Sequence, residues 1–237
     1  MRVMTFNTQH CLNFIERKID FQIMADTIKR CGADIVGLNE MRGQGTEPEY
    51  TPQVAILSEL TGLSNQYFAK AIEVRDHNPY GNGLLSRLPI LHAETIMIPD
   101  PEVKDPNRRY ETRCILKAKL EGGITVLVTH FGLNPEEQKN AVNTVLEHLE
   151  SENCILMGDF NVVPDNALLD PIRARMKDTA ELFKSPLLSF RSDTPNVKID
   201  YIFVSPDIEV VAADIPAIVA SDHRPHTATI NIPNTTK

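Results

Sequence analysis

The segment from Cys154 to Asn161, C-I-L-M-G-D-F-N, constrains the fold of this 237-residue chain more than any other. Its first four residues are uncharged and mostly apolar, which predicts a buried strand, and Gly158 ends that run. Asp159 and Asn161 lie two residues apart, and such residues on extended chain point to the same side. We therefore expect a carboxylate and a carboxamide at the end of a buried strand, where catalytic groups tend to lie. An Asp-Asn turn that only closes the strand would explain this segment alone equally well.

Composition narrows the class of protein and of partner. Apolar residues make up 42% of the chain, and no run approaches the roughly 20 apolar residues of a membrane span, so we expect a soluble globular protein. The N-terminus lacks the apolar core of a signal peptide, and the four cysteines show no paired spacing, which together predict a cytoplasmic location. The net charge of −8 disfavours tight, sequence-independent binding of duplex nucleic acid, because such binding depends on a basic surface.

Hydrophobic periodicity predicts more strands than helices. Helices are expected at 16–31, at 51–60, from Asn134 onward and at about 165–176. Strands are expected at 2–7, 33–40, 66–74, 83–86, 90–98, 112–120, 124–129, 154–157, 198–204, 208–213 and 226–232. No linker, repeat or composition shift marks a boundary, so we expect one domain over residues 1–237. This pattern predicts an α/β fold in which two mixed sheets pack together with helices outside.

Polar side chains recur at the predicted strand ends. Nine of them are candidates for a functional site: Asn7, Glu40, Asn82, His130, Asp159, Asn161, Asp200, Asp222 and His223. Several have simpler explanations when taken alone, Asn7 as a turn residue, Glu40 as a solvated acid and His130 as a core histidine. Asp200 is harder to explain in this way, because it interrupts the apolar strand K-I-D-Y-I-F-V and a buried carboxylate needs a partner or a metal.

If these groups converge, the oxygen-rich ones predict a metal site. Glu40, Asp222 and Asn7, with Asp159 as a possible addition, offer hard oxygen ligands. Such ligands suit Mg²⁺ or Mn²⁺, whereas a zinc site would contain more His and Cys. A bound divalent ion would polarise a phosphoryl oxygen or stabilise a leaving group.

The remaining candidates predict acid–base chemistry on a phosphate ester. Asp200 bonded to His223 would fix the imidazole tautomer and raise its basicity, as an orienting acid does for a general base. His130, together with Asn82 and Asn161, would donate hydrogen bonds to a phosphoryl oxygen as its negative charge grows. Convergence would therefore equip the protein for phosphate-ester hydrolysis.

Eight motifs together resemble one known family. In chain order they are T-F-N, N-E, Y-G-N-G-L-L-S-R-L-P-I, E-T-R, T-H, G-D-F-N, K-I-D-Y-I-F-V-S and S-D-H-R-P. They resemble the successive motifs of the endonuclease/exonuclease/phosphatase superfamily, which includes pancreatic-type deoxyribonucleases, abasic-site endonucleases, inositol-polyphosphate 5-phosphatases and neutral sphingomyelinases. Eight motifs in this order between residues 4 and 225 are far more specific than any one tripeptide. The resemblance implies a four-layered α-β-β-α sandwich with its site at one edge of the two sheets.

The resemblance also implies roles on the metal side of the site. Asn7 and Glu40 match positions that bind or orient the metal, Glu40 most directly, and Asp222 matches a further metal-side acid. Asp159 matches the residue that orients the attacking water or a second metal. Asn161 matches its phosphate-contacting neighbour.

On the phosphate side, Asp200 and His223 match the family's Asp-His pair. His130 matches a histidine that contacts the phosphate or assists the leaving group in phosphatases and deoxyribonucleases. Arg113, preceded by Glu111, resembles an arginine beside the phosphate. The resemblance thus implies that Arg113 and His130 help to bind the substrate phosphate.

Two positions depart from the family pattern. Asn39 stands where a Gln usually precedes the metal-binding Glu, and we expect it to alter an indirect contact more than the chemistry. Asn82 stands where deoxyribonucleases carry a Glu paired to the histidine, so His130 lacks that acidic partner. Asn82 is instead expected to contact the substrate phosphate, as fits the phosphatase and sphingomyelinase-like branches.

Three functions remain to be compared. The first is a divalent-metal-dependent phosphoesterase that acts on a small or medium phosphomonoester or phosphodiester, which the acidic charge, Asn82 and His130 favour. The second is a nuclease of the same fold, which a basic rim or aromatic side chains along a groove would favour. The third is an inactive binding module, which loss of an acid or a histidine would indicate, yet all are present. Specificity is expected in the surface loops 42–52, 75–82, 99–112 and 184–196.

Overall fold

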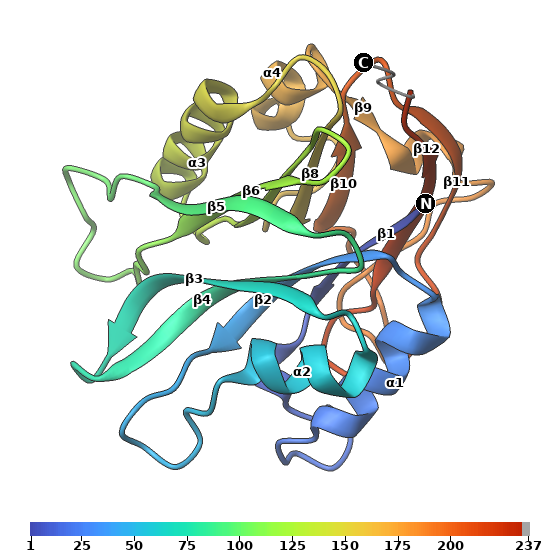
Figure 1. The fold of residues 1–237 in the computed structure, drawn as a ribbon. Coiled ribbons are helices and arrows are strands. Elements are labelled where there is room, and N and C mark those ends of the chain that lie inside the picture. The colour runs from blue at the N-terminus through green and yellow to red at the C-terminus, as the bar shows by residue number, and fades with distance from the viewer. Residues whose placement is uncertain (234–237) are drawn as a thin grey trace.

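The computed structural model describes residues 1–233 and confirms an α/β sandwich of two mixed six-stranded sheets packed face to face (Figure 1). The first sheet has the order β11 (Glu209–Asp214), β12 (His226–Asn231), β1 (Arg2–Asn7), β2 (Ile35–Arg42), β4 (Asn78–Ser86), β3 (Asn65–Val74). The second has the order β5 (Ile90–Met97), β6 (Cys114–Leu120), β7 (Ile124–His130), β8 (Cys154–Asp159), β10 (Asp200–Val204), β9 (Lys177–Asp178). Residues 234–237 of the predicted domain lie outside the described residues.

Helices cover the outer face of each sheet and complete four layers (Figure 1). Two lie on the first sheet, α1 (Phe21–Cys31) and α2 (Gln53–Thr61), and two on the second, α3 (Pro135–His148) and α4 (Asp170–Arg173). Three apolar clusters fill the spaces between the layers, and the middle cluster joins the two sheets. No helix in residues 1–233 has both the length and the apolar character needed to cross a membrane.

Strand register gathers the polar strand ends at one edge. β1 and β2 run parallel, with Asn7 opposite Asn39. β7 and β8 also run parallel, with His130 opposite Asp159, and antiparallel β10 places Asp200 opposite Asp159 on its other side. Hydrogen bonds that link Asn7 and Asn39 of the first sheet to Asp159 of the second show that these two edges meet.

The predicted strand 154–157 does not stop before Gly158. This glycine lies inside β8, which continues to Asp159. It pairs with Thr129 of β7 and with Tyr201 of β10. Its φ is 151°, and a Cβ built there would lie 1.8 Å from the Thr129 carbonyl oxygen. Glycine at this position lets two backbones approach closely next to the site, while the strand continues to Asp159.

Three predicted elements have boundaries that differ from the structure by more than two residues. α1 begins at Phe21 and not at residue 16, because the Asp20 side chain caps it by accepting hydrogen bonds from the backbone N–H groups of Gln22 and Ile23, both at 3.1 Å. In the segment 165–176 only α4 is α-helical, preceded by a 3₁₀ turn. β4 starts at Asn78, so most of the expected loop 75–82 is strand.

The start of α3 matches its prediction. Asn134 precedes the helix and Pro135 occupies its first position. The Glu137 carboxylate reaches back to accept a hydrogen bond from the Asn134 backbone N–H at 3.1 Å. A carboxylate in the first turn also interacts favourably with the helix dipole.

Candidate active site

The polar strand ends surround a cavity of about 560 Å³. Seven of the ten residues predicted for the site line it: Glu40, Arg113, His130, Asp159, Asn161, Asp222 and His223. The other three, Asn7, Asn82 and Asp200, are buried next to the lining residues. The structure therefore brings all ten residues into one region. Three of them lie behind the cavity wall and do not face the cavity.

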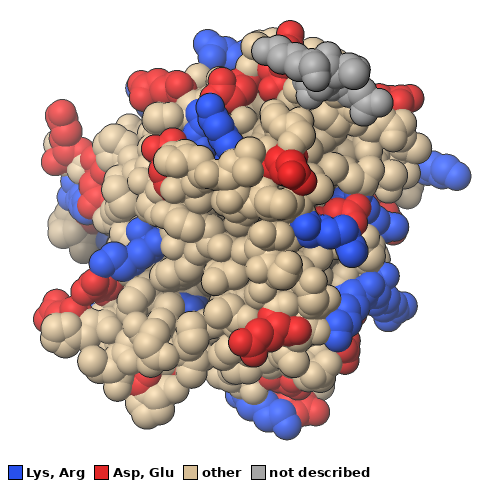
Figure 2. Space-filling view, viewed as in Figure 1, with Lys and Arg blue, Asp and Glu red and all other residues tan. Residues whose placement is uncertain are grey.

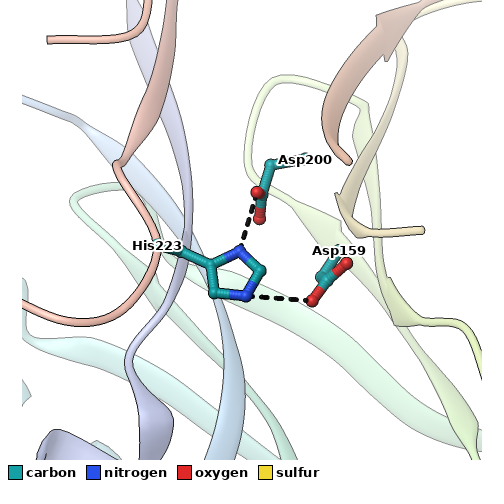
Figure 3. A group of neighbouring side chains, drawn as sticks. All are labelled: Asp159, Asp200 and His223. Carbon is teal, nitrogen blue, oxygen red and sulfur yellow. Dashed lines mark hydrogen bonds and ion pairs between the residues drawn. The ribbon is translucent and has the colours of Figure 1, made fainter. Parts of the chain in front are cut away.

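His223 joins two buried carboxylates (Figure 3). Its Nδ1 lies 2.8 Å from Asp200 Oδ2, and its Nε2 lies 3.6 Å from Asp159 Oδ2. Burial opposes a charge on this imidazole, but Asp200 and Asp159 outweigh it and raise the pKa of His223 to about 10. The imidazole is therefore protonated at neutral pH and suited to donate a hydrogen bond to an anion.

Asp159 lies at the centre of the cluster and has little access to water. Burial raises the pKa of this carboxyl group to about 7, against the opposing effect of the His223 charge. A carboxylate whose pKa lies near the working pH is well matched to take a proton in catalysis. Asp159 thus joins His223, the residue predicted from sequence, as a candidate for the general base.

Asn7 orients two acids through its amide nitrogen. Its Nδ2 donates to Glu40 Oε1 at 3.1 Å and to Asp159 Oδ2 at 3.0 Å, while its Oδ1 accepts from the backbone N–H of Gln9 at 3.0 Å. The amide oxygen that the metal prediction requires is therefore turned to the backbone. In this arrangement Asn7 positions the acids and does not offer its oxygen to a metal.

Glu40 and Asp222 offer carboxylate oxygens that suit a divalent cation. Both line the cavity, and burial, reinforced by the negative charge of Asp222, raises the pKa of Glu40. Two acids that repel each other in a partly dehydrated cavity fit a bound cation, and their oxygen donors suit Mg²⁺ or Mn²⁺. The buried Asp159, Asp200 and His223 also lie within ligand distance of one another, although His223 occupies both acids with its own hydrogen bond and ion pair.

His130 is neutral and held between an arginine and an acid. Arg113 Nη1 lies 3.2 Å from His130 Nδ1, and because arginine only donates, the proton of the neutral ring resides on Nε2. That Nε2 lies 3.5 Å from Asp159 Oδ2. Burial, followed by the Arg113 charge, holds the pKa of His130 well below its ordinary value. Arg113 itself pairs with Glu111 at 2.6 Å.

Asn161 reaches the cluster by a turn and not on extended chain. Its φ is 50°, and its backbone N–H donates to Asp159 Oδ1 at 2.9 Å. Its Nδ2 donates to the Phe131 carbonyl at 3.0 Å and lies 3.3 Å from His130 Nε2. The two side chains converge as predicted, but the assumed backbone conformation was wrong.

Asn82 lies outside the cavity lining, where its amide is fully used. Its Oδ1 accepts from Asn39 Nδ2 at 2.9 Å, and its Nδ2 donates to the Cys114 carbonyl at 3.0 Å. A side chain bonded in this way has no free donor for a substrate phosphate. The structure therefore argues against the expected phosphate contact and gives Asn82 a positioning role behind Asn39.

The sequence did not predict the central role of Asn39 or three further residues of the cavity wall. The Asn39 Oδ1 accepts from the Asp159 backbone N–H at 2.9 Å, so this residue of the first sheet holds the central acid of the second. His10, Arg42 and Tyr80 also line the cavity. Only the one-residue departure from the family pattern drew attention to Asn39, and no sequence signal indicated the other three.

Comparison with known proteins identifies the family. The model of the endonuclease/exonuclease/phosphatase family matches residues 4–223. The chain belongs to this family. Members of the endonuclease/exonuclease/phosphatase family are hydrolases that act on phosphoesters.

Relatives of this family member cover almost its whole length. The uncharacterized protein YbhP of Escherichia coli (strain K12) is 24% identical over 250 residues, which span 98% of this chain and 96% of YbhP. A family structure from Beutenbergia cavernae is similar with a TM-score of 0.82 and 23% identity, over 98% of this chain and 71% of that one. The mannosyl-6-phosphatase of Bacteroides thetaiotaomicron is similar with a TM-score of 0.75 and 15% identity, over 98% and 100% of the two chains.

Proposed function

We propose that this protein is a Mg²⁺- or Mn²⁺-dependent phosphoesterase that hydrolyses a small or medium phosphomonoester or phosphodiester by in-line attack of water. One observation carries the proposal: Asp159 of the second sheet lies within 3.6 Å of the His223 imidazole, while Asn7 links it to Glu40 of the first. A proton acceptor, a proton donor and a metal-side acid therefore share one cavity. Family membership supports phosphoester hydrolysis as the reaction class.

In the proposed reaction, different side chains accept a proton, donate a hydrogen bond and bind the metal. Asp159 accepts the proton of the attacking water as the new P–O bond forms. The His223 imidazolium, held by Asp200, donates a hydrogen bond to the phosphoryl oxygen that gains charge while the bond to the leaving oxygen breaks. Glu40 and Asp222 would hold the divalent ion, which would polarise the phosphoryl group and stabilise developing negative charge.

The phosphate is held by donors on the opposite wall. Arg113 contacts Nδ1 of the neutral His130, and Nε2 of that ring lies 3.5 Å from Asp159 Oδ2. His130 carries its proton on Nε2, so it donates to a phosphoryl oxygen that displaces its contact with Asp159. Asn161 lies next to His130 and extends this row of donors.

Two observations favour a small substrate over a nucleic acid. The cavity of about 560 Å³ falls in the range of small-molecule sites. The net charge is −8, and on the face shown in Figure 2 the Lys and Arg side chains are interspersed with acids and form no continuous basic stripe. The similarity in fold to a mannosyl-6-phosphatase is consistent with a phosphomonoester. The face shown in Figure 2 therefore gives no support to the second candidate, a nuclease.

The test is a hydrolysis screen with divalent metal. An aryl phosphate, an aryl phosphodiester, a panel of phosphorylated metabolites, and single-stranded and duplex DNA and RNA are each incubated with the protein and Mg²⁺ or Mn²⁺. We expect hydrolysis of a small substrate, inhibition by EDTA and a loss of roughly 10²-fold or more in kcat in His223→Ala. Activity that persists in EDTA, or near-normal turnover in His223→Ala, contradicts the proposal. A preference for DNA or RNA supports the nuclease instead.

A further inference from the structure

Arg42 is a cavity-lining cation without a counter-charge. It is the last residue of β2, two positions after Glu40, and both residues line the same cavity. Its guanidinium carbon lies 4.7 Å from the centre of the Tyr50 ring, and its Nε is buried without a hydrogen-bond partner. Within residues 1–233, no carboxylate comes within ion-pair distance of this guanidinium.

The other two arginines of the cavity differ in this respect. Arg113 pairs with Glu111 at 2.6 Å, and Arg109 pairs with the other oxygen of Glu111 at 3.1 Å. Both of these cations therefore pair with one acid on the wall next to His130. Arg42 contacts different neighbours and has no such acid.

Nearby groups leave the Arg42 charge uncompensated. His10 also lines the cavity, but an imidazole carries no negative charge that could pair with Arg42. The Tyr50 ring face offers only a weak interaction compared with a carboxylate partner. An arginine fork has its donors in a fixed plane that matches the oxygens of a phosphate or a carboxylate.

The backbone at Arg42 is fixed before any ligand arrives. The buried Gln53 side chain accepts from the Arg42 backbone N–H at 2.9 Å and donates to the His10 carbonyl at 2.9 Å. Tyr50, under the guanidinium, is itself buried. A fixed backbone and a stacked guanidinium reduce the ordering cost of binding an anion.

We propose that Arg42 binds a second anionic group of the substrate, separate from the phosphate that reacts near Asp159. The inference rests on the proposed function and narrows its substrate class to small phosphoesters that carry another phosphate or a carboxylate. The reacting phosphate occupies the wall of His223, His130 and Arg113, and the second anion occupies the wall of Arg42 and Tyr50.

The experiment compares substrates that differ only at their far end. Three series with two to six carbons are used: alkanediol bisphosphates, ω-phospho-alkanoic acids and ω-hydroxyalkyl phosphates. At the best length we expect kcat/KM for an anionic end to exceed that for the hydroxyl end by about tenfold or more, as a charge-assisted hydrogen bond allows. In Arg42→Gln this preference should fall by about tenfold, and Arg42→Lys should restore part of it. The first two series distinguish phosphate from carboxylate as the second group.

The matched control is Arg87→Gln, which removes an exposed arginine paired with Asp34 outside the cavity. We expect it to keep the wild-type preference, and thermal melts of all variants confirm folding. No preference at any length in the wild type overturns the inference, as does an equal loss on all three series in a folded Arg42→Gln. A trinucleotide preferred over every small dianion overturns the small-molecule class.

A binding measurement separates this inference from the proposed function. Calorimetry in Mg²⁺ compares alkane bisphosphonates with the matching alkyl phosphonates, which cannot be hydrolysed at the P–C bond. Tighter binding of a bisphosphonate that is lost in Arg42→Gln supports the anion site even if no substrate is turned over. Equal binding of the two ligands overturns the anion site even if the phosphoesterase activity is found.

Discussion

Replacing Asn39 by Leu should destabilise the protein through three hydrogen bonds at once. Asn39 is buried, its Oδ1 accepts from the Asp159 N–H, and its Nδ2 donates to Asn82 Oδ1 and to the Thr129 carbonyl, each at 2.9 Å. Leucine has nearly the same shape but no polar atoms. The substitution therefore leaves one donor and two acceptors buried and unpaired while creating almost no cavity.

The magnitude follows from these three orphaned groups. A buried donor or acceptor left without a partner costs about 1–3 kcal/mol, and mutational series centre near 1 kcal/mol for each hydrogen bond. Three groups predict a loss of about 3 kcal/mol in the free energy of unfolding, reduced by the apolar surface that Leu adds. A total stability of about 5–15 kcal/mol for a domain of ordinary stability would tolerate such a loss, so the variant should still fold.

Urea unfolding followed by circular dichroism measures this loss. The control is Asn231→Leu, which removes one exposed hydrogen bond to Glu209 and should change the free energy of unfolding by no more than about 0.5 kcal/mol. Activity should fall in Asn39→Leu as well, because the backbone of Asp159 loses its anchor. A loss of stability below about 1 kcal/mol in Asn39→Leu would refute the view that this amide connects the sheets.

Three further predictions follow from the structure. Gly158→Ala should abolish soluble expression or cost more than about 3 kcal/mol in urea unfolding, since the new Cβ would lie 1.8 Å from the Thr129 carbonyl oxygen. Asp200→Asn should lower the pKa of His223, measured by NMR, and reduce kcat by roughly 10²-fold, whereas an unchanged pKa would exclude Asp200 as its main cause. Burial lowers the pKa of His226 to about 3. As the pH falls below about 6.5, this histidine is protonated in the unfolded chain but not in the folded chain, so the free energy of unfolding decreases. The loss by pH 5 is roughly 2 kcal/mol and should be smaller in a folded His226→Gln variant, as urea unfolding at pH 7 and pH 5 would show.

Strand ends were predictable because their signal is local. In β8 and β1 a short apolar run leads to a polar residue at the end of the strand, and in β10 Asp200 precedes the apolar run. Each of these polar residues lies at the candidate site. The motifs and their order along the chain then identified the family, which the comparisons confirm, and its two-sheet fold, which the structure confirms. The local sequence pattern did not predict element boundaries where a side chain or a neighbouring backbone decides the conformation. Asp20 delays the start of α1, and the close approach of Thr129 keeps Gly158 within its strand.

Side-chain orientation was not predictable, because it depends on residues far apart in sequence. Sequence suggested Asn7 as an oxygen ligand, yet two acids, one 33 and one 152 residues away, attract its amide nitrogen and turn its oxygen to the backbone. Asn82 was expected to face the phosphate, yet its amide oxygen accepts a hydrogen bond from Asn39 and its amide nitrogen donates one to Cys114. The cation Arg42 could not be singled out among 24 basic residues until the positions of the acids around it were known.

The amides Asn7 and Asn39 explain why the site needs both sheets. Asp159 belongs to β8 of the second sheet, but its carboxylate is held by Asn7 of β1 and its backbone N–H by Asn39 of β2. The distance between Asp159 and Glu40 is therefore set by how the two sheets pack, and the apolar cluster between the sheets fixes that packing. A substitution that shifts the sheets by a fraction of an ångström should separate Asp159 from Glu40 before it unfolds the protein. Activity should consequently be more sensitive than stability to changes in the layer between the sheets.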